Sequence, residues 1–228
     1  MLQAVIFDMD GVLFDTEPLS AEGWRVASRQ FGIPVDEDIL QAVLGSNADS
    51  TRETMLRAYG PDFPFDAMNR VHWAYVSDYI AEHGVPVKPG VRSFLAYLKS
   101  IGLPTAVASS STRQRVLDNL RGACLSEFFG AVVGGEDIAH SKPAPDIYLA
   151  AARLLGVSPE RCAAIEDSPN GLLSAKRAGM IPIMIPDLIP PDRQDSARFC
   201  FSSMNELHRV WQADGGAFLD APASCGAV

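Results

Sequence analysis

Cysteine is scarce in this chain, with four residues among 228, and none of them lies in a CxxC pair. This spacing gives no support to a thiol-redox motif or a zinc site. A disulfide framework is not expected either, because such frameworks stabilise much shorter secreted chains. The sequence leaves a single disulfide bond as an alternative. The cysteines are Cys124, Cys162, Cys200 and Cys225.

Long apolar runs and a basic leader are also missing. No stretch reaches the ~18 uninterrupted apolar residues that a membrane-spanning helix needs. The first residues, MLQAVIFDMDG, carry no basic charge before their apolar run, and acids interrupt that run too early for a secretory signal. We therefore expect a cytoplasmic protein with no membrane association.

Positive charge is in deficit, since the net charge is −9 and the sequence pI is about 4.9. This balance argues against nucleic acid, whose phosphate backbone attracts clustered Lys and Arg. A small phosphorylated metabolite stays compatible, because its binding site needs few local cations. With 47% hydrophobic and 21% charged residues, the chain has the composition of a globular protein. We expect it to be a monomer.

Short apolar runs alternate with segments of helical spacing over much of the chain. This alternation predicts an α/β protein with a parallel sheet whose strands are buried on both faces. The expected strands are 2–7, 104–108, 131–133, 162–165 and 181–185, and the expected helices between them are 91–100, 114–121, 146–155 and 171–178.

Residues 18–83 differ, because they hold no clear strand run and show four helical patterns. We expect a helical insert at 16–87, with the α/β core formed by 1–15 and 88–228. The linkers, near 15–18 and 85–90, are short and predict a lid that can move. The expected helices of the insert are 20–31, 36–44, 50–59 and 65–83.

Polar side chains follow four of the expected strands, and in parallel sheets ligands bind at this carboxyl edge. The segments there are DMDGVLFDT (8–16), ASSS (108–111), SKPAPDIY (141–148) and IEDSPNG (165–171). Together, in this order and spacing, they resemble the four motifs of the haloacid dehalogenase superfamily over nearly the whole chain. Within this superfamily the chain resembles the β-phosphoglucomutase-like phosphatases, including sugar-phosphate and pseudouridine-phosphate phosphatases.

The resemblance implies a Rossmann-like parallel core with an inserted α-helical cap, and it implies roles for three residues. Asp8 would attack phosphorus and form an aspartyl-phosphate. Asp10 would protonate the leaving alkoxide and then take a proton from the attacking water. Lys142 would neutralise charge on the phosphate and on Asp8.

The resemblance also implies a Mg²⁺ cofactor, because Mg²⁺ prefers oxygen ligands. Asp8 and Asp167 would supply carboxylates, Asp10 its backbone carbonyl, and Glu166 would act directly or through water. The alternative for Asp167 is the N-cap of the following helix.

Ser109 is expected to donate a hydrogen bond to a phosphoryl oxygen of the substrate, and Ser110 or Ser111 could take this role instead. The alternative is that the serine only caps the following helix. Thr16 either faces the site or caps a helix. Asn47, in the 45–47 loop of the cap, either recognises substrate or belongs to a simple turn.

The related mutases carry a histidine and an arginine in the cap that this chain lacks in ungapped alignment. The first position is Ser20, and the second falls at or near Ala48, with Arg52 the nearest arginine. We therefore expect a Mg²⁺-dependent phosphatase acting on a small phosphomonoester, either a sugar phosphate or a nucleotide-related compound. The alternative is a β-phosphoglucomutase-type isomerase. A phospho-accepting receiver domain is disfavoured, because receivers have neither the leaving-group acid nor a cap.

Overall fold

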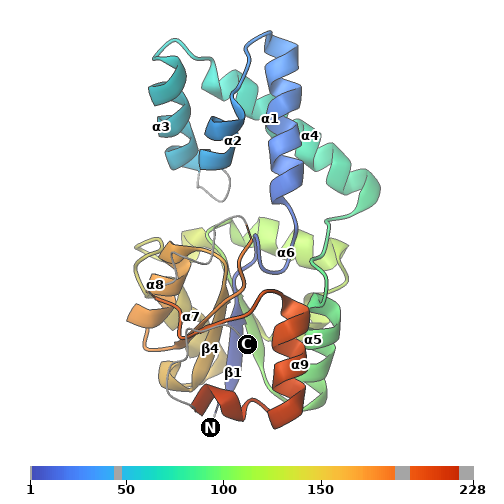
Figure 1. Cartoon of the computed structure of the whole chain (residues 1–228), viewed down its shortest axis with the longest axis vertical. Helices are drawn as coiled ribbons and strands as arrows, with labels where there is room; N and C mark the ends of the chain where they lie inside the picture. The colour runs from blue at the N-terminus through green and yellow to red at the C-terminus, as the bar shows by residue number, and fades with distance from the viewer. Residues whose placement is uncertain (1, 44–47, 188–195, 221–228) are drawn as a thin grey trace. The chain divides into compact units, whose positions relative to one another are not determined.

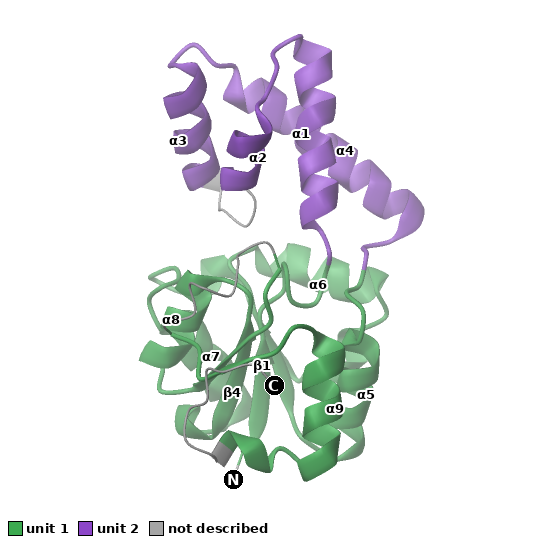
Figure 2. Cartoon of the chain, viewed as in Figure 1, with its two compact units in different colours: residues 1–14, 87–228 green, residues 15–86 purple. Residues whose placement is uncertain are grey.

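The chain divides into two compact units, which Figure 2 shows in different colours. The computed structural model describes residues 2–43, 48–187 and 196–220. One unit is formed by 1–14 and 87–228, and the other by 15–86. These limits lie one residue from the limits expected from the sequence.

The larger unit is built on a six-stranded sheet in the order β3-β2-β1-β4-β5-β6, and all of its pairings are parallel. The α/β fold with a parallel, Rossmann-like sheet is thereby confirmed. Every residue of β1, β2 and β4 is buried, as their uninterrupted apolar runs predicted. The strands are β1 Ala4–Phe7, β2 Thr105–Ala108, β3 Ala131–Val133, β4 Cys162–Glu166, β5 Ile181–Met184 and β6 Phe199–Cys200.

Helices cover both faces of this sheet (Figure 1). Helices α7 and α8 contact β1, β2, β4 and β5 on one face, where alanines of the strands leave room for Ile147 and Tyr148. On the other face α5 and α9 lie together, and Phe94 joins Phe7 to Trp211 through edge-to-face ring contacts. The helices are α5 Val91–Ser100, α6 Arg113–Gly122, α7 Asp146–Leu155, α8 Pro169–Arg177 and α9 Met204–Asp214.

The smaller unit is helical, as expected, and has its own core. Trp24, Leu40, Met55 and Met68 are buried in it. Its helices are α1 Glu17–Phe31, α2 Glu37–Val43, α3 Ala48–Tyr59 and α4 Phe65–His83. Across the residues that the structure describes, no helix has the length and apolar character needed to cross a membrane. The described cysteines, Cys124, Cys162 and Cys200, are free.

The order of the strands decides which loops meet. Strand β1 lies between β2 and β4, so the chain leaves β1 on one side and later returns to its other side. Such a switch point opens a crevice beyond the carboxyl ends of the strands. The backbone N–H of Asp8 donates to the carbonyl of Ile165 at 2.9 Å, so Asp8 is held against the end of β4.

Candidate active site

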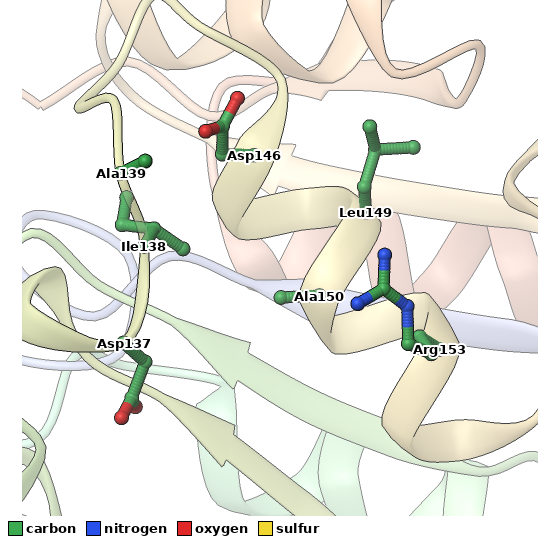
Figure 3. A pocket seen from close by; sticks show the side chains of 7 residues that line it. All are labelled: Asp137, Ile138, Ala139, Asp146, Leu149, Ala150 and Arg153. Carbon is green, nitrogen blue, oxygen red and sulfur yellow. The ribbon is translucent and has the colours of Figure 1, made fainter.

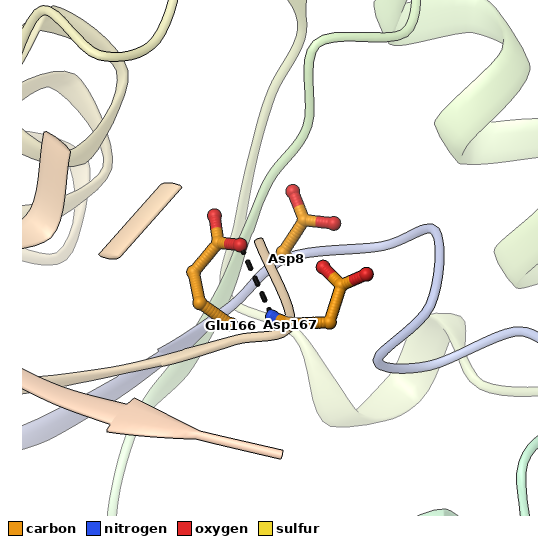
Figure 4. Close-up of side chains that lie close together, drawn as sticks. All are labelled: Asp8, Glu166 and Asp167. Atoms are coloured by element: carbon orange, nitrogen blue, oxygen red, sulfur yellow. Dashed lines mark hydrogen bonds between the residues drawn. The ribbon is translucent and has the colours of Figure 1, made fainter. Parts of the chain in front are cut away.

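Three carboxylates meet where β1 and β4 end (Figure 4). Asp8, Glu166 and Asp167 each offer an oxygen, and these oxygens lie within 4.8 Å of one another. Asp8 and Glu166 are buried, and Asp167 is partly buried. Hard oxygen donors at this spacing suit Mg²⁺, which binds few carboxylates and keeps several waters. The residues present therefore fit the metal that the sequence predicted.

Lys142 is the cation of this cluster. Its ammonium group donates to Asp8 Oδ1, to Glu166 Oε1 at 2.7 Å and to the carbonyl of Ala108 at 3.1 Å. A lysine has three N–H donors, so these contacts use all of them and fix the position of Nζ. The side chain is 8% exposed. A buried, fixed cation is thus in contact with the expected nucleophile.

Glu166 is held on both of its oxygens. Oε1 accepts from Lys142 and from the hydroxyl of Tyr148 at 2.6 Å, while Oε2 accepts from Ser168 Oγ at 3.1 Å and from the backbone N–H of Asp167 at 3.2 Å. A side chain at Gly171 would begin 1.9 Å from this carboxylate. The glycine of the fourth motif is therefore required by close approach. Tyr148 lies in the third motif, yet sequence reasoning gave it no role.

Burial dominates the electrostatics of the site. It raises the pKa of Asp8 to about 7, against the opposing effect of Lys142, and Glu166 raises it further. Burial also raises the pKa of Asp167 well above its usual range, with contributions from Glu166, Asp8 and Asp187. Burial lowers the pKa of Lys142, but Asp8 and Glu166 outweigh that effect and raise it. The carboxylates outnumber the ammonium group, so the site favours a further cation.

The turn after β1 requires the glycine of the first motif. Gly11 has φ +79°, and a Cβ at this position would lie 2.3 Å from Asp167 Oδ2. A side chain would be strained by the backbone and would collide with the carboxylate. Asp10, one residue earlier, accepts a hydrogen bond from Ser111 Oγ at 3.2 Å. The first, second and fourth motifs thus meet here, as the sequence predicted.

Two helix-capping alternatives are ruled out by the structure. The N-cap of α6 is Thr112, not one of the three serines before it. The N-cap of α8 is Ser168, whose Oγ accepts from the N–H of Gly171 at 3.1 Å, and not Asp167.

The three serines differ in their surroundings. Ser109 is buried and its Oγ accepts from the N–H of Ser111 at 3.1 Å, while Ser110 is exposed. Their roles toward phosphate stay predictions.

The expected substrate residues of the helical unit are only partly described. Thr16 is buried at the N-cap position of α1, but its side chain makes no capping hydrogen bond. Asn47 lies outside the described residues. Ser20 is hydrogen-bonded to His72 Nε2 at 3.0 Å, and Arg52 is paired with Asp66.

A hollow of about 230 Å³ lies elsewhere on the larger unit, between the 137–139 loop and α7 (Figure 3). Its lining includes Asp137, Asp146 and Arg153, and it contains none of the site residues described above. The residues that line this hollow form no cluster of metal ligands or nucleophiles, so it is not the candidate active site.

Comparisons with known proteins agree with this geometry. Residues 2–179 match the family model of the haloacid dehalogenase-like hydrolases. The chain is 35% identical to a phosphorylated carbohydrates phosphatase of Thermotoga maritima, covering 78% of this chain and 82% of that one. It is 30% identical to β-phosphoglucomutase of Bacillus subtilis, covering 92% and 96%.

A solved structure shows the same architecture. CbbY of Rhodobacter sphaeroides, in complex with xylulose-(1,5)-bisphosphate, superposes with a TM-score of 0.75 at 28% identity, covering 91% of this chain and 96% of that one. The chain therefore belongs to the haloacid dehalogenase-like hydrolases, and it is an enzyme of their phosphatase and phosphoglucomutase group.

Proposed function

We propose that the protein is a Mg²⁺-dependent phosphatase that hydrolyses a small phosphomonoester through an aspartyl-phosphate on Asp8. One observation carries the proposal: the buried Asp8 carboxylate is in contact with Lys142 and lies within metal-ligand reach of Asp167. The proposed nucleophile and a metal-binding carboxylate thus lie at the adjacent ends of β1 and β4, and the loop before α7 brings the Lys142 ammonium group to them.

In the first step, an Asp8 oxygen forms a bond to phosphorus as the bond from phosphorus to the ester oxygen breaks. Asp10 gives its proton to the departing alkoxide, and Lys142 neutralises charge that builds up during the transfer. Asp10 is placed for this step because it lies two residues after Asp8, with its carboxyl positioned by a hydrogen bond from Ser111 Oγ at 3.2 Å.

In the second step, Asp10 takes a proton from water as the water oxygen attacks phosphorus. The bond to Asp8 breaks, phosphate leaves, and both carboxyl groups return to their starting states. Magnesium, when bound, offsets repulsion between the carboxylates and the phosphate dianion.

Four residues would hold the metal. Asp8 and Asp167 would bind it through carboxylate oxygens, and Asp10 through its backbone carbonyl. Glu166 would contact it through water, because both of its oxygens already have protein partners.

The substrate is proposed to be a phosphorylated carbohydrate or a similarly small phosphorylated metabolite. Support comes from the phosphatase relative, whose name specifies phosphorylated carbohydrates. The isomerase alternative is supported by the β-phosphoglucomutase relative. It is disfavoured because Ser20 stands at the mutase histidine position and Arg52, the arginine nearest to the other position, is paired with Asp66. We further propose that the cap, through its 45–47 loop, distinguishes one phosphomonoester from another.

The test is phosphate release from a panel of phosphorylated sugars, sugar alcohols and nucleosides, with Mg²⁺ and after its removal by a chelator. Free phosphate that appears only with Mg²⁺ supports the proposal. With β-glucose 1-phosphate, formation of glucose 6-phosphate instead of free phosphate would establish the isomerase. Substitutions in the 45–47 loop should change the ranking of the panel while p-nitrophenyl phosphate hydrolysis persists, and an unchanged ranking would refute the role of the loop.

A further inference from the structure

A fourth acid lies at the same edge of the sheet. Asp187 follows β5, which is paired with β4 through Glu166 and Met184. Asp187 lies outside the four sequence motifs, which follow other strands. The parallel pairing brings the end of β5 beside the end of β4, so Asp187 reaches the region of Asp167.

Lys88 holds one oxygen of this acid. Its ammonium group donates to Asp187 Oδ1 at 2.5 Å, and the two side chains are 16% and 11% exposed, respectively. Lys88 is itself positioned by the turn after β1, since its backbone N–H donates to the carbonyl of Leu13 at 3.0 Å. The pair therefore fixes the orientation of the Asp187 carboxylate.

The other oxygen, Oδ2, is buried and has no hydrogen-bond partner within the described part of the chain. It faces the metal-binding region across Gly11. A Cβ on Gly11 would lie 2.3 Å from Asp167 Oδ2 and 3.3 Å from Asp187 Oδ2. The two oxygens thus flank the space that the absent side chain leaves open.

An unpaired buried carboxylate oxygen is costly, because the group loses its hydration without compensation. Here a second carboxylate lies close by, which adds repulsion between like charges. Magnesium relieves both costs, because it brings positive charge and keeps several waters that donate hydrogen bonds outward.

We propose that Asp187 belongs to the magnesium site without contacting the ion, and that its Oδ2 accepts hydrogen bonds from the ion's water shell. Lys88 is the positioning residue that aims this oxygen. This inference rests on the proposed function, because it requires magnesium at Asp8 and Asp167.

The test is calorimetric titration of Mg²⁺ into the metal-free full-length chain. Asp187→Asn keeps the shape and an acceptor for Lys88 but removes the charge. Loss of a group that contacts a metal site without binding the ion itself weakens metal binding by about 10-fold or more. The Kd of Asp187→Asn for Mg²⁺ is therefore expected to be at least about 10-fold higher than that of wild type. Asp118→Asn is the matched control, because it removes the same charge from an exposed residue of α6 that pairs with Arg121.

Asp187→Ser, measured in parallel with thermal unfolding of the metal-free chains, provides a second variant. A Kd within about twofold of wild type for Asp187→Asn would overturn the inference, judged against the 10-fold loss typical of such partners. An equal loss in Asp118→Asn would also overturn it. Failure of both Asp187 variants to fold without metal would mean that the residue is structural, and the inference would then be wrong as well. If wild type itself binds no Mg²⁺, the proposed function fails too.

Discussion

Asp8 differs from an ordinary aspartate because it is buried beside a fixed ammonium group. Its carboxylate accepts from Lys142 and lies within 4.8 Å of oxygens of Glu166 and Asp167. These contacts are the ones that the proposed nucleophilic role requires.

Asp8→Asn should abolish turnover while the fold persists. The amide has nearly the same shape but cannot attack phosphorus. Steady-state phosphate release by the purified variant checks this, with circular dichroism as the control for folding. Retention of more than about a tenth of wild-type activity would exclude Asp8 as the nucleophile.

Asp10→Asn should reduce activity by an amount that depends on the leaving group. General acid–base help is typically worth ~10²–10⁴-fold, and a basic alkoxide needs the proton more than p-nitrophenolate does. The ratio of kcat/KM between wild type and variant should therefore be larger for a sugar phosphate than for p-nitrophenyl phosphate. Equal ratios would assign Asp10 to metal binding or structure alone.

Tyr148→Phe should destabilise the protein. The hydroxyl is fully buried and donates to the charged Glu166 at 2.6 Å, and its removal leaves Oε1 with one donor fewer. Hydrogen bonds to charged groups contribute about 1.5–3 kcal/mol, so a loss of that size in the free energy of unfolding is expected from urea titration. A loss below about 0.5 kcal/mol would show that another donor replaces the hydroxyl.

At the scale of the element, two helices of the larger unit begin with a serine cap but differ in their relation to the site. Ser203 caps α9 by accepting from the N–H of Glu206 at 3.2 Å. Ser168 caps α8 and also donates to Glu166 Oε2 at 3.1 Å. One cap therefore serves its helix, and the other serves both its helix and the active site.

Ser203→Ala should cost about 1 kcal/mol of stability, the typical value for an N-cap, and leave kcat unchanged. Ser168→Ala should cost at least as much and should also lower kcat, because Glu166 loses a donor. Urea unfolding and steady-state kinetics on both variants provide the comparison. Equal kcat values in the two variants would show that the hydrogen bond from Ser168 to Glu166 does not contribute to catalysis.

At the scale of the whole molecule, the buried carboxylates couple stability to pH and to metal. The pKa of Asp8 rises from 3.8 to about 7 on folding. Between these values the folded, metal-free chain keeps a proton that the unfolded chain has released, so its free energy of unfolding falls as pH rises. The raised pKa of Asp167 acts in the same direction.

Magnesium favours the deprotonated ligands, so its stabilising effect should grow over the same window. The rise in Tm that Mg²⁺ produces should be larger near about pH 7.5 than near about pH 5.5. Differential scanning calorimetry with and without the metal checks this. Taking the difference between the two Tm values at each pH removes the effect of titrating groups that lie far from the metal site. In Asp8→Asn the pH dependence of this rise should shrink, and a rise independent of pH in wild type would contradict the coupling.

Local sequence determined much of this protein. The apolar runs predicted β1 to β5 because buried parallel strands are apolar on both faces, and helical spacing predicted α5 to α8 and the four helices of the cap. The acids, serines and lysine that follow the strand ends predicted that Asp8, Asp10, Lys142 and Asp167 lie at one edge of the sheet, because parallel strands present their carboxyl ends together.

Only the tertiary structure decided the rest. Strand β6 is a pairing of two residues, too short to give a pattern of its own. Helix α9 does show helical spacing in Met204, Leu207 and Trp211, but it was not among the predicted helices, and the structure shows that it packs against α5. The roles of Tyr148, Lys88 and Asp187 depend on which segments the strand order brings together. Tyr148 and its partner Glu166 are 18 residues apart in the sequence, and Lys88 and its partner Asp187 are 99 residues apart. Residue type and local spacing do not predict such contacts, because the contacts arise from tertiary packing rather than from local propensity.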